Sequence, residues 1–239
     1  MTTLGVAAVD RALRILEAFR ADDRGLTLAE IARRTGYYKS TILRLADSLE
    51  KFGFLKRSSD GLYQIGYKPL FLASLYQGQF RSSDHVLPVL RRLVDEWNES
   101  ASFYVREGDR RICTFRVQGR RSVTDTVREG DTLDLRLGAA GRVLLAFGGE
   151  RGTRYDQIRR ELFAASFGER DPETAAYACP VFGQSRAVVG CISLSGPRYR
   201  IETLAREAVV ASLAENAAEL TAAFGGDVTA FGPLTAKRG

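Results

Sequence analysis

Two short helices joined by a very tight turn are predicted near the N-terminus. Thr27 and Glu30 have the spacing of a capping box, in which a hydroxyl and a carboxylate each satisfy a free backbone N–H at a helix start. Gly36 is placed to end that helix in the left-handed conformation. A second helix is predicted from Lys39 to Phe52, with Gly53 directly after it. Because the connection between them is so short and contains glycine, the pair predicts a helix-turn-helix.

The neighbouring segments extend this pair to a winged helix-turn-helix. Upstream, Asp10 is placed as the N-cap of a helix whose apolar residues recur at helical spacing, namely Ala12, Leu13, Ile15, Leu16 and Phe19. Downstream, residues 54–57 and 62–65 have the composition of two short strands, and residues 58–61 between them have strong turn chemistry. Three helices followed by a β-hairpin predict a winged helix-turn-helix DNA-binding domain over residues 1–66.

Positive charge is concentrated in this predicted domain. The chain has 35 basic and 29 acidic residues, a net charge of +6, whereas residues 33–57 alone hold seven basic and two acidic residues, a net charge of +5. Such a run is often only a solvated face. Here, however, hydroxyl and basic side chains lie opposite the apolar stripe of the third helix, where they suit the major groove and its phosphates. The residues predicted to contact DNA are Arg33, Arg34, Lys39, Ser40, Thr41, Arg44, Lys51, Lys56 and Arg57.

The rest of the chain predicts a linker and a second domain. Residues 67–81 are apolar at more positions than one face of an isolated helix should expose, so they predict a linker helix that packs on another domain or another chain. Residues 82–225 predict an antiparallel sheet with inserted helices, closed by a helix from about Glu202 to Phe224. Residues 226–239 have no periodicity and are expected to be a mobile tail. The predicted fold class is α+β.

Motifs from both predicted domains resemble the IclR family of bacterial transcriptional regulators, in the family's order. The resemblance covers about residues 6–225 and is carried by the segments Val9–Leu16, Leu28–Ala32, Lys39–Leu45, Gly61–Gly66, Leu135–Ala146, Ala178–Phe182 and Ser193–Pro197. The chain departs from the usual pattern at Tyr38, where a proline often precedes the Lys-Ser pair, and this change should leave the helix intact.

The resemblance implies a winged helix-turn-helix joined by a linker helix to a GAF-like effector-binding domain. It also implies a homodimer or homotetramer that binds double-stranded operator DNA and regulates transcription. We expect a repressor in preference to an activator. The implied effectors are small organic acids or aromatic catabolic compounds. In the family pattern, Glu169, Cys179, Ser193 and Ser195 match positions that line the effector site.

The residue types in the second domain also suit an anionic ligand. Ala139, Ala140 and Gly141 stand at a predicted helix start, which offers backbone N–H groups and the positive end of the helix dipole. Ser193 and Ser195 alternate along one strand, so their hydroxyls fall on one face and can hold a carboxylate. Plainer interpretations stay open: close helix–sheet packing for the glycines, polar decoration of a strand for the serines, and a small buried apolar residue for Cys179.

Other classes of function find little support. The single histidine, His85, and three separated cysteines do not suit a metal site or a disulfide framework, so we expect no metal and no cofactor. No Walker or dinucleotide-binding motif is present, and a cysteine nucleophile would lack a base, so we expect no catalytic residues. We expect neither a membrane segment nor a secretory signal. The expected location is therefore the cytoplasm. The alternatives are a winged-helix DNA-binding protein without small-molecule control and, more remotely, an enzyme.

Overall fold

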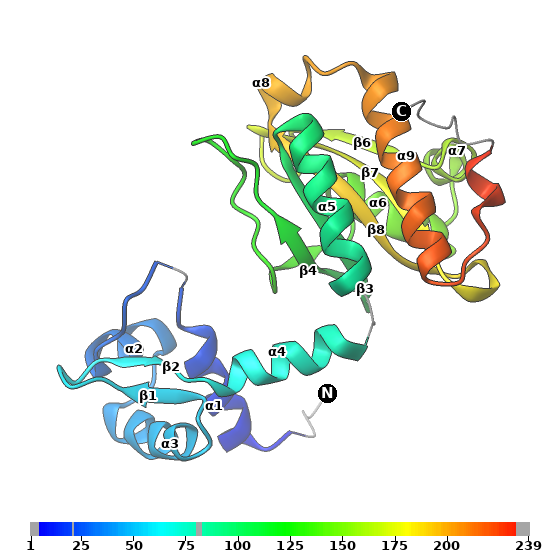
Figure 1. Cartoon of the computed structure of the whole chain (residues 1–239). Helices are drawn as coiled ribbons and strands as arrows, with labels where there is room; N and C mark the ends of the chain where they lie inside the picture. Colours follow the sequence, from blue (N-terminus) through cyan, green and yellow to red (C-terminus); the bar gives the residue numbers. More distant parts are fainter. Residues whose placement is uncertain (1–4, 21, 80–82, 233–239) are drawn as a thin grey trace. The chain divides into compact units, whose positions relative to one another are not determined.

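The computed structural model describes residues 5–20, 22–79 and 83–232. It divides the chain into two compact units, with the boundary between Gln79 and Phe80 (Figure 1). Each unit has its own buried core and is described separately below.

Three helices and a hairpin form the N-terminal unit. The helices are α1 (Ala7–Glu17), α2 (Leu28–Thr35) and α3 (Lys39–Lys51). The capping box at the start of α2 is confirmed, because Thr27 Oγ1 accepts from the Glu30 N–H at 3.2 Å and Glu30 Oε2 accepts from the Thr27 N–H at 2.9 Å. Gly36 ends α2 with a φ of 73°, in the left-handed region that the sequence required there.

The prediction for Asp10 was wrong. Helix α1 begins three residues earlier, at Ala7, and its N-cap residue Val6 makes no side-chain cap. Asp10 instead lies in the first turn, where a carboxylate favourably faces the positive end of the helix dipole.

The wing is a two-stranded antiparallel sheet of β1 (Leu55–Arg57) and β2 (Tyr63–Ile65), in which Leu55 pairs with Ile65. Leu26, in the segment before α2, forms a further bridge to Tyr63. The core of the unit collects one face from every element, and its buried members are Ile15, Leu26, Ile31, Ile42, Ala46, Leu49, Leu55 and Tyr63. This packing of the hairpin against the helices fixes the wing beside the N-terminal end of α2.

The predicted linker helix corresponds to α4 (Lys68–Gln79), which begins one residue later than expected. The last two residues of the predicted segment, Phe80 and Arg81, lie outside the described residues. Leu70, Phe71, Leu72 and Leu75 on α4 are exposed within the chain. Exposed apolar surfaces of this kind commonly mark interaction sites.

The C-terminal unit is built on a six-stranded antiparallel sheet with the order β5-β4-β3-β8-β7-β6. Its strands are β3 (Ser100–Glu107), β4 (Arg110–Val117), β5 (Thr132–Asp134), β6 (Ala164–Phe167), β7 (Thr174–Phe182) and β8 (Val188–Pro197). The α+β class is therefore confirmed. Sequence reasoning located β3, β4, β7 and β8 to within a few residues, but it missed the short edge strands β5 and β6.

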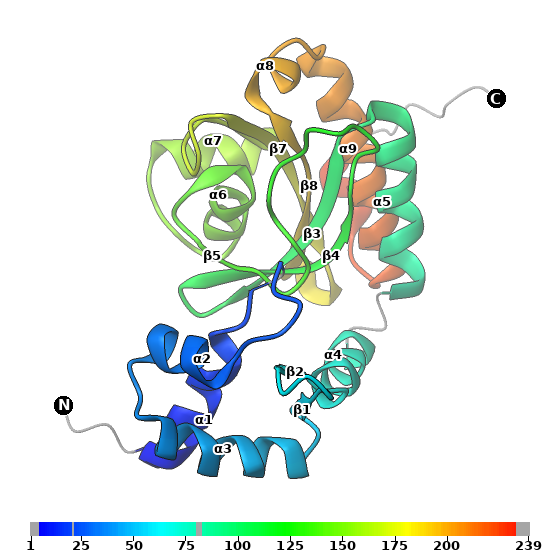
Figure 2. The ribbon, with the colours of Figure 1, turned by 90° about the vertical axis from the view of Figure 1, so that its left-hand side faces the viewer.

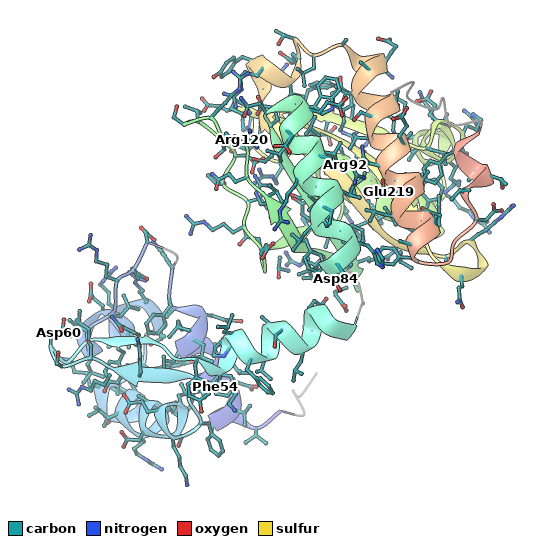
Figure 3. All side chains as sticks on the ribbon, viewed as in Figure 1. Phe54, Asp60, Asp84, Arg92, Arg120 and Glu219 are labelled. Carbon is teal, nitrogen blue, oxygen red and sulfur yellow. The ribbon has the colours of Figure 1, made fainter. Side chains whose placement is uncertain are left out.

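Helices cover both faces of this sheet (Figure 2). On one face lie α5 (Ser83–Trp97) and α9 (Arg206–Ala223), whose side-by-side packing includes an ion pair between Arg92 and Glu219 (Figure 3). On the other face lies α6 (Gly138–Phe147), packed on β7 and β8 and backed by α7 (Thr153–Glu161). The two faces bury separate apolar clusters, and the candidate ligand site lies on the α6 face.

The end of the chain differs from its prediction in two ways. The closing helix α9 begins at Arg206, not near Glu202, because a separate short turn α8 (Arg198–Ile201) precedes it. Within the predicted tail, residues 228–231 form the short 3-10 helix η2, and the ring of Phe231 packs on that of Phe182 with 5.9 Å between centroids. Among the described helices, none is both long and apolar enough to cross a membrane.

Candidate nucleic-acid and ligand-binding sites

Helix α3 presents a polar face opposite its buried stripe. Ile42, Ala46 and Leu49 are buried against the rest of the N-terminal unit. Away from them, Lys39, Ser40, Arg44 and Lys51 are exposed and Thr41 is half-buried. These basic side chains form no ion pair with another residue in the described part of the chain, so they are available to phosphates and base edges.

The wing adds two further exposed basic residues, Lys56 and Arg57, on β1. The Arg57 guanidinium lies over the ring of Tyr63, 5.4 Å from its centroid, and its Nε donates to the Gly61 carbonyl at 3.4 Å. These contacts hold the side chain along the hairpin while leaving most of its fork of donors in solvent.

The structure separates Arg34 from the other predicted DNA contacts. Arg34 Nη2 donates to Asp23 Oδ1 at 2.8 Å, and Nη1 donates to the Ala18 carbonyl at 2.8 Å. This hydrogen-bonded ion pair lowers the pKa of Asp23 to about 2. Arg34 therefore ties the segment between α1 and α2 to the end of α2, and its side chain is only 15% exposed. Its neighbour Arg33 is exposed.

Sequence reasoning passed over one exposed aromatic residue at the start of α3. Tyr38 is 85% exposed and occupies the N-cap position, where its side chain makes no capping hydrogen bond. A large aromatic ring held in solvent beside Lys39 is suited to contact sugar or base edges. From the sequence, Tyr38 was interpreted only as a departure from the family pattern. The position of Tyr38 directly before the third helix was the signal that could have identified it.

In the C-terminal unit, four of the seven predicted effector residues come together. Ala139 and Ala140 at the start of α6 and Ser193 and Ser195 on β8 line one small cavity of about 40 Å³. The two serines point to the same face of the sheet, as their alternation required. A volume of this size holds one or a few waters and is far below the roughly 300 Å³ of an ordinary ligand pocket.

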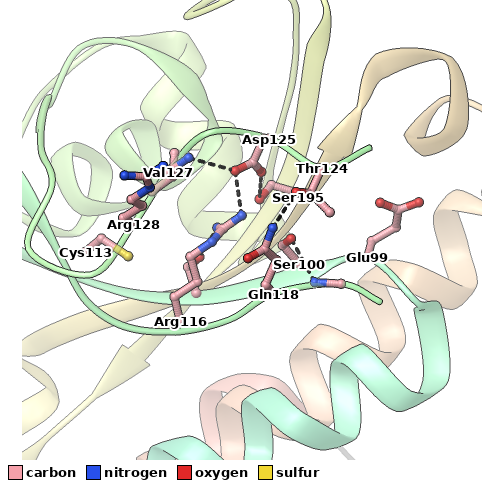
Figure 4. Close-up of polar contacts among 12 residues, drawn as sticks. Glu99, Ser100, Cys113, Arg116, Gln118, Thr124, Asp125, Val127, Arg128 and Ser195 are labelled. Atoms are coloured by element: carbon pink, nitrogen blue, oxygen red, sulfur yellow. Dashed lines mark hydrogen bonds and ion pairs between the residues drawn. The ribbon is translucent and has the colours of Figure 1, made fainter. Parts of the chain in front are cut away.

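Both serine hydroxyls already have acceptors within the protein. Ser193 Oγ donates to the Tyr177 carbonyl at 2.9 Å, and Ser195 Oγ donates to Asp125 Oδ2 at 2.5 Å. Asp125 in turn accepts from Arg116 Nη2 at 2.5 Å and from the Val127 N–H at 3.1 Å (Figure 4). The Arg116 and Asp125 side chains are only 6% and 1% exposed, so this is a buried ion pair.

The other three predicted effector residues do not line this cavity. Gly141 packs so tightly that an added Cβ would overlap the Leu135 carbonyl, which supports the plainer interpretation of close packing. Glu169 is ion-paired with Arg142, whose Nε donates to it at 3.0 Å, and its carboxylate approaches the Gly138 N–H only at 3.4 Å.

Cys179 lies on the opposite face of the sheet. Side chains alternate along β7, so Ala178 faces α6 whereas Cys179 belongs to the apolar cluster shared with α5 and α9. Burial raises the pKa of its thiol above the usual value, which leaves it neutral and inert. In this structure Cys179 is a core residue and does not line the small cavity.

A larger cavity of about 520 Å³ adjoins the small one. It is lined by residues 123–126, by Asp171, Glu173 and Thr174 and by Pro197, Arg198, Tyr199 and Glu202. Asp125 and Thr174 line both cavities. We call them the inner cavity (40 Å³) and the outer cavity (520 Å³).

Sequence reasoning missed Arg111, a buried wall of the inner cavity. It lies on β4, is 4% exposed, and has its guanidinium 5.5 Å from the centroid of the Tyr104 ring. Its Nη1 donates to the carbonyls of Asp134 and Leu137, the latter at 2.6 Å. Alternation along β4 was the only signal, because it places residue 111 with Cys113 on the inward face. The described residues contain no group of three or more histidine, cysteine or acidic side chains that could hold a metal ion.

Family models match both units of the chain. Residues 8–59 match the IclR helix-turn-helix domain, and residues 152–222 match the C-terminal domain of the bacterial transcriptional regulator IclR. The HTH-type transcriptional regulator KipR of Bacillus subtilis is 26% identical over 196 residues, covering 72% of this chain and 78% of its own. BhcR of Paracoccus denitrificans, also an HTH-type transcriptional regulator, is 26% identical over 243 residues, covering 91% and 87%.

Solved structures share the architecture of the whole chain. An IclR transcriptional regulator from Alicyclobacillus acidocaldarius has a TM-score of 0.75 and 25% identity, with 92% of this chain and 100% of that chain covered. An IclR homologue from Microbacterium hydrocarbonoxydans, solved in complex with 4-hydroxybenzoate, has a TM-score of 0.73 and 22% identity, with 90% and 98% covered.

Proposed function

The chain belongs to the IclR family of bacterial transcriptional regulators, and from this premise we propose that it is a ligand-responsive, sequence-specific repressor of transcription. Like its relatives, the chain is a DNA-binding regulator of transcription and not an enzyme. We propose its specific DNA contacts, its ligand, its sign of regulation and its oligomeric state in turn.

The observation that carries the DNA-binding half is the free basic face of the N-terminal unit. We assign Arg44 and the hydroxyls of Ser40 and Thr41 to the major groove, where arginine pairs with guanine O6 and N7. Lys39, Lys51, Lys56, Arg57 and Arg33 then neutralise phosphates along the same duplex. Arg34 is left out of this set because Asp23 already holds it.

The ligand in this proposal is a small organic acid or an aromatic catabolite. The inner cavity lies at the start of α6, which supports a carboxylate, and the outer cavity has room for the remainder of the molecule. The 4-hydroxybenzoate bound by a protein of the same fold is an acid of this kind. The two DNA-binding units of an oligomer can adopt more than one relative arrangement. A ligand regulates DNA binding if these arrangements differ in their affinity for the ligand.

We propose that the working form is a homodimer or a higher homo-oligomer in the cytoplasm. Exposed apolar side chains on α4 are supplemented by an apolar groove of about 330 Å³ between α1 and α3, with Val9, Leu13 and Phe52 exposed beside it. Covering these surfaces with a second copy of the chain would also present two recognition helices to a pseudo-palindromic operator.

The small size of the inner cavity favours a second candidate, a winged-helix DNA-binding protein without small-molecule control. A mobility-shift titration on the gene's own upstream DNA, with and without a panel of small carboxylates, separates the two. Specific binding that one acid alters supports the sensor, whereas specific binding that no acid alters supports the alternative. Absence of specific binding even to genome-wide selected fragments would contradict both.

A further inference from the structure

Arg111 carries a buried positive charge with one edge unused. Its Nη1 donates two hydrogen bonds, both to backbone carbonyls. Its Nε is buried without a hydrogen-bond partner among the described residues. Neither Nε nor Nη2 donates to any described group. Burial lowers the pKa of this guanidinium, but an arginine side chain stays charged at neutral pH.

The surroundings of Arg111 add positive potential without supplying a direct ion-pair partner. The guanidinium lies against the first turn of α6, where a Cβ on Gly138 would be 3.5 Å from Nη2 and one on Gly141 would be 2.9 Å from Nη1. That turn is the positive end of the helix dipole. Arg170, which is half-buried, lines the same cavity and brings a second guanidinium.

Asp134 is the carboxylate whose charge acts on Arg111, but it is exposed and accepts from the Arg136 N–H instead of forming an ion pair with Arg111. Two other carboxylates near the cavity are already paired with other arginines. Asp125 is bound by Arg116, and Glu169 by Arg142. Arg111 takes part in no ion pair within 4.0 Å among the described residues. A buried guanidinium beside a helix N-terminus, with no directly paired carboxylate, is costly for the protein unless an anion enters.

We propose that the Nε and Nη2 edge of Arg111 receives the carboxylate of the ligand in the inner cavity, as a side-on bidentate pair. The inference rests on the ligand-binding half of the proposed function and deepens it by naming the residue that selects for charge. A fork of two parallel N–H donors matches the two oxygens of a carboxylate, which is the geometry that gives such pairs their strength. The inner cavity has room for that group alone.

The outer cavity further restricts the class of ligand to monocarboxylates. Asp171, Glu173 and Glu202 stand on its wall, and Arg198, the one basic lining residue, is already paired with Glu202, its Nε donating at 2.6 Å. A second carboxylate on the ligand would therefore face uncompensated negative charge. The part of the ligand that lies in the outer cavity is neutral or cationic.

The test uses formate, the smallest molecule that carries the recognised group, and formamide as its uncharged match. Binding of each to the full-length protein is measured by line broadening of the ¹³C signal at constant ionic strength. Arg111→Gln removes the charge and the fork, and Arg111→Lys keeps the charge but loses the fork. Arg110→Gln is the matched control, because Arg110 is the preceding residue on β4 and is exposed.

We expect saturable binding of formate and none of formamide. Arg111→Gln should weaken formate binding at least about tenfold, since charge-assisted hydrogen bonds of this kind contribute about 1.5–3 kcal/mol. Arg111→Lys should fall between Arg111→Gln and the wild type, and Arg110→Gln should bind as the wild type does. Melting curves of each variant establish that it is folded, and Arg111→Lys carries the test if Arg111→Gln does not fold.

Three results would overturn the proposal: equal binding of formate and formamide, unchanged formate binding in a folded Arg111 variant, or equal loss in Arg110→Gln. A parallel titration compares benzoate with benzene-1,4-dicarboxylate, and tighter binding of the dicarboxylate would refute the restriction to monocarboxylates. None of these measurements involves DNA. Failure to bind operator DNA would therefore contradict the proposed function, whereas failure to bind formate would contradict only the role of Arg111.

Discussion

Ser195 on β8 donates a hydrogen bond of 2.5 Å to Asp125, which lies 70 residues earlier in the chain, between β4 and β5. The sequence assigned Ser195 to the carboxylate of a ligand, yet the protein supplies a carboxylate of its own at that hydroxyl. A ligand carboxylate that takes a hydrogen bond from Ser195 must therefore displace Asp125. Arg111 has no such competitor, which is why we place the ligand's charge on Arg111 and not on the serines.

Removing Asp125 should destabilise the C-terminal unit strongly. Asp125→Ala leaves Arg116 buried without its counter-charge and frees the hydroxyl of Ser195. We expect the free energy of unfolding to fall by about 3–5 kcal/mol, the usual cost of breaking a buried ion pair. Urea unfolding followed by the fluorescence of Trp97, the chain's only tryptophan, reports on this unit.

Asp156→Ala is the matched control for that measurement. Its carboxylate also pairs with an arginine, Arg159, but it is about half exposed. Exposed pairs contribute little, so the change should stay within about 1 kcal/mol. Similar losses in the two variants would mean that the burial of the Asp125–Arg116 pair has no energetic consequence.

How far the sequence predicts this molecule depends on the range of the interaction. The capping box of Thr27 and Glu30 and the turn at Gly36 are local, and both were predicted correctly. The ion pair that holds Arg34 was not predicted, because its partner Asp23 is eleven residues away, across a turn. Cys179 matched a family position, but the alternation of β7 turns it to the other face of the sheet. The role of Arg111 as a cavity wall depends on the packing of β4, β5 and α6, which lie far apart in the sequence.

Acid should remove the contribution of the Asp23–Arg34 pair to the stability of the N-terminal unit. The pKa of Asp23 is lowered from 3.8 to about 2, so the folded state holds this carboxylate ionised more tightly than the unfolded chain does. That contribution is fully present above about pH 4 and is lost as the pH falls through 2. Thermal unfolding between pH 5 and 2 should show a smaller acid-dependent loss in Asp23→Asn than in the wild type. Parallel curves for the two proteins would contradict this assignment.

Arg44 should contribute specificity, and Lys56 should contribute only charge. Arg44→Ala is expected to weaken operator binding by about 1–3 kcal/mol, the value of a bidentate arginine–guanine pair. Lys56→Ala should weaken binding to all sequences alike and reduce the salt dependence by about one phosphate contact. Mobility shifts at several salt concentrations on specific and random DNA distinguish the two effects.

Two controls accompany the DNA-binding series. Arg91→Ala removes an exposed arginine from α5 in the C-terminal unit and should leave both measurements unchanged. Arg34→Ala should lower the melting temperature of the N-terminal unit, whereas Arg33→Ala should weaken DNA binding without changing that temperature. Wild-type operator affinity in Arg44→Ala would remove Arg44 from the recognition surface.

Charge placed on the exposed surface of α4 should break the proposed oligomer without unfolding the chain. Leu70 is 76% exposed and Leu75 is 50% exposed, so glutamates at both positions meet water in the monomer but an apolar surface in the proposed dimer. Each leucine buried at an interface contributes about 1.5–3 kcal/mol, so the double variant should raise the dissociation constant at least about a hundredfold. Sedimentation at several protein concentrations measures this. Val123→Glu, at a similarly exposed apolar residue of the C-terminal unit, should leave association unchanged. If the α4 variant sediments as the wild type does, the second copy covers another surface.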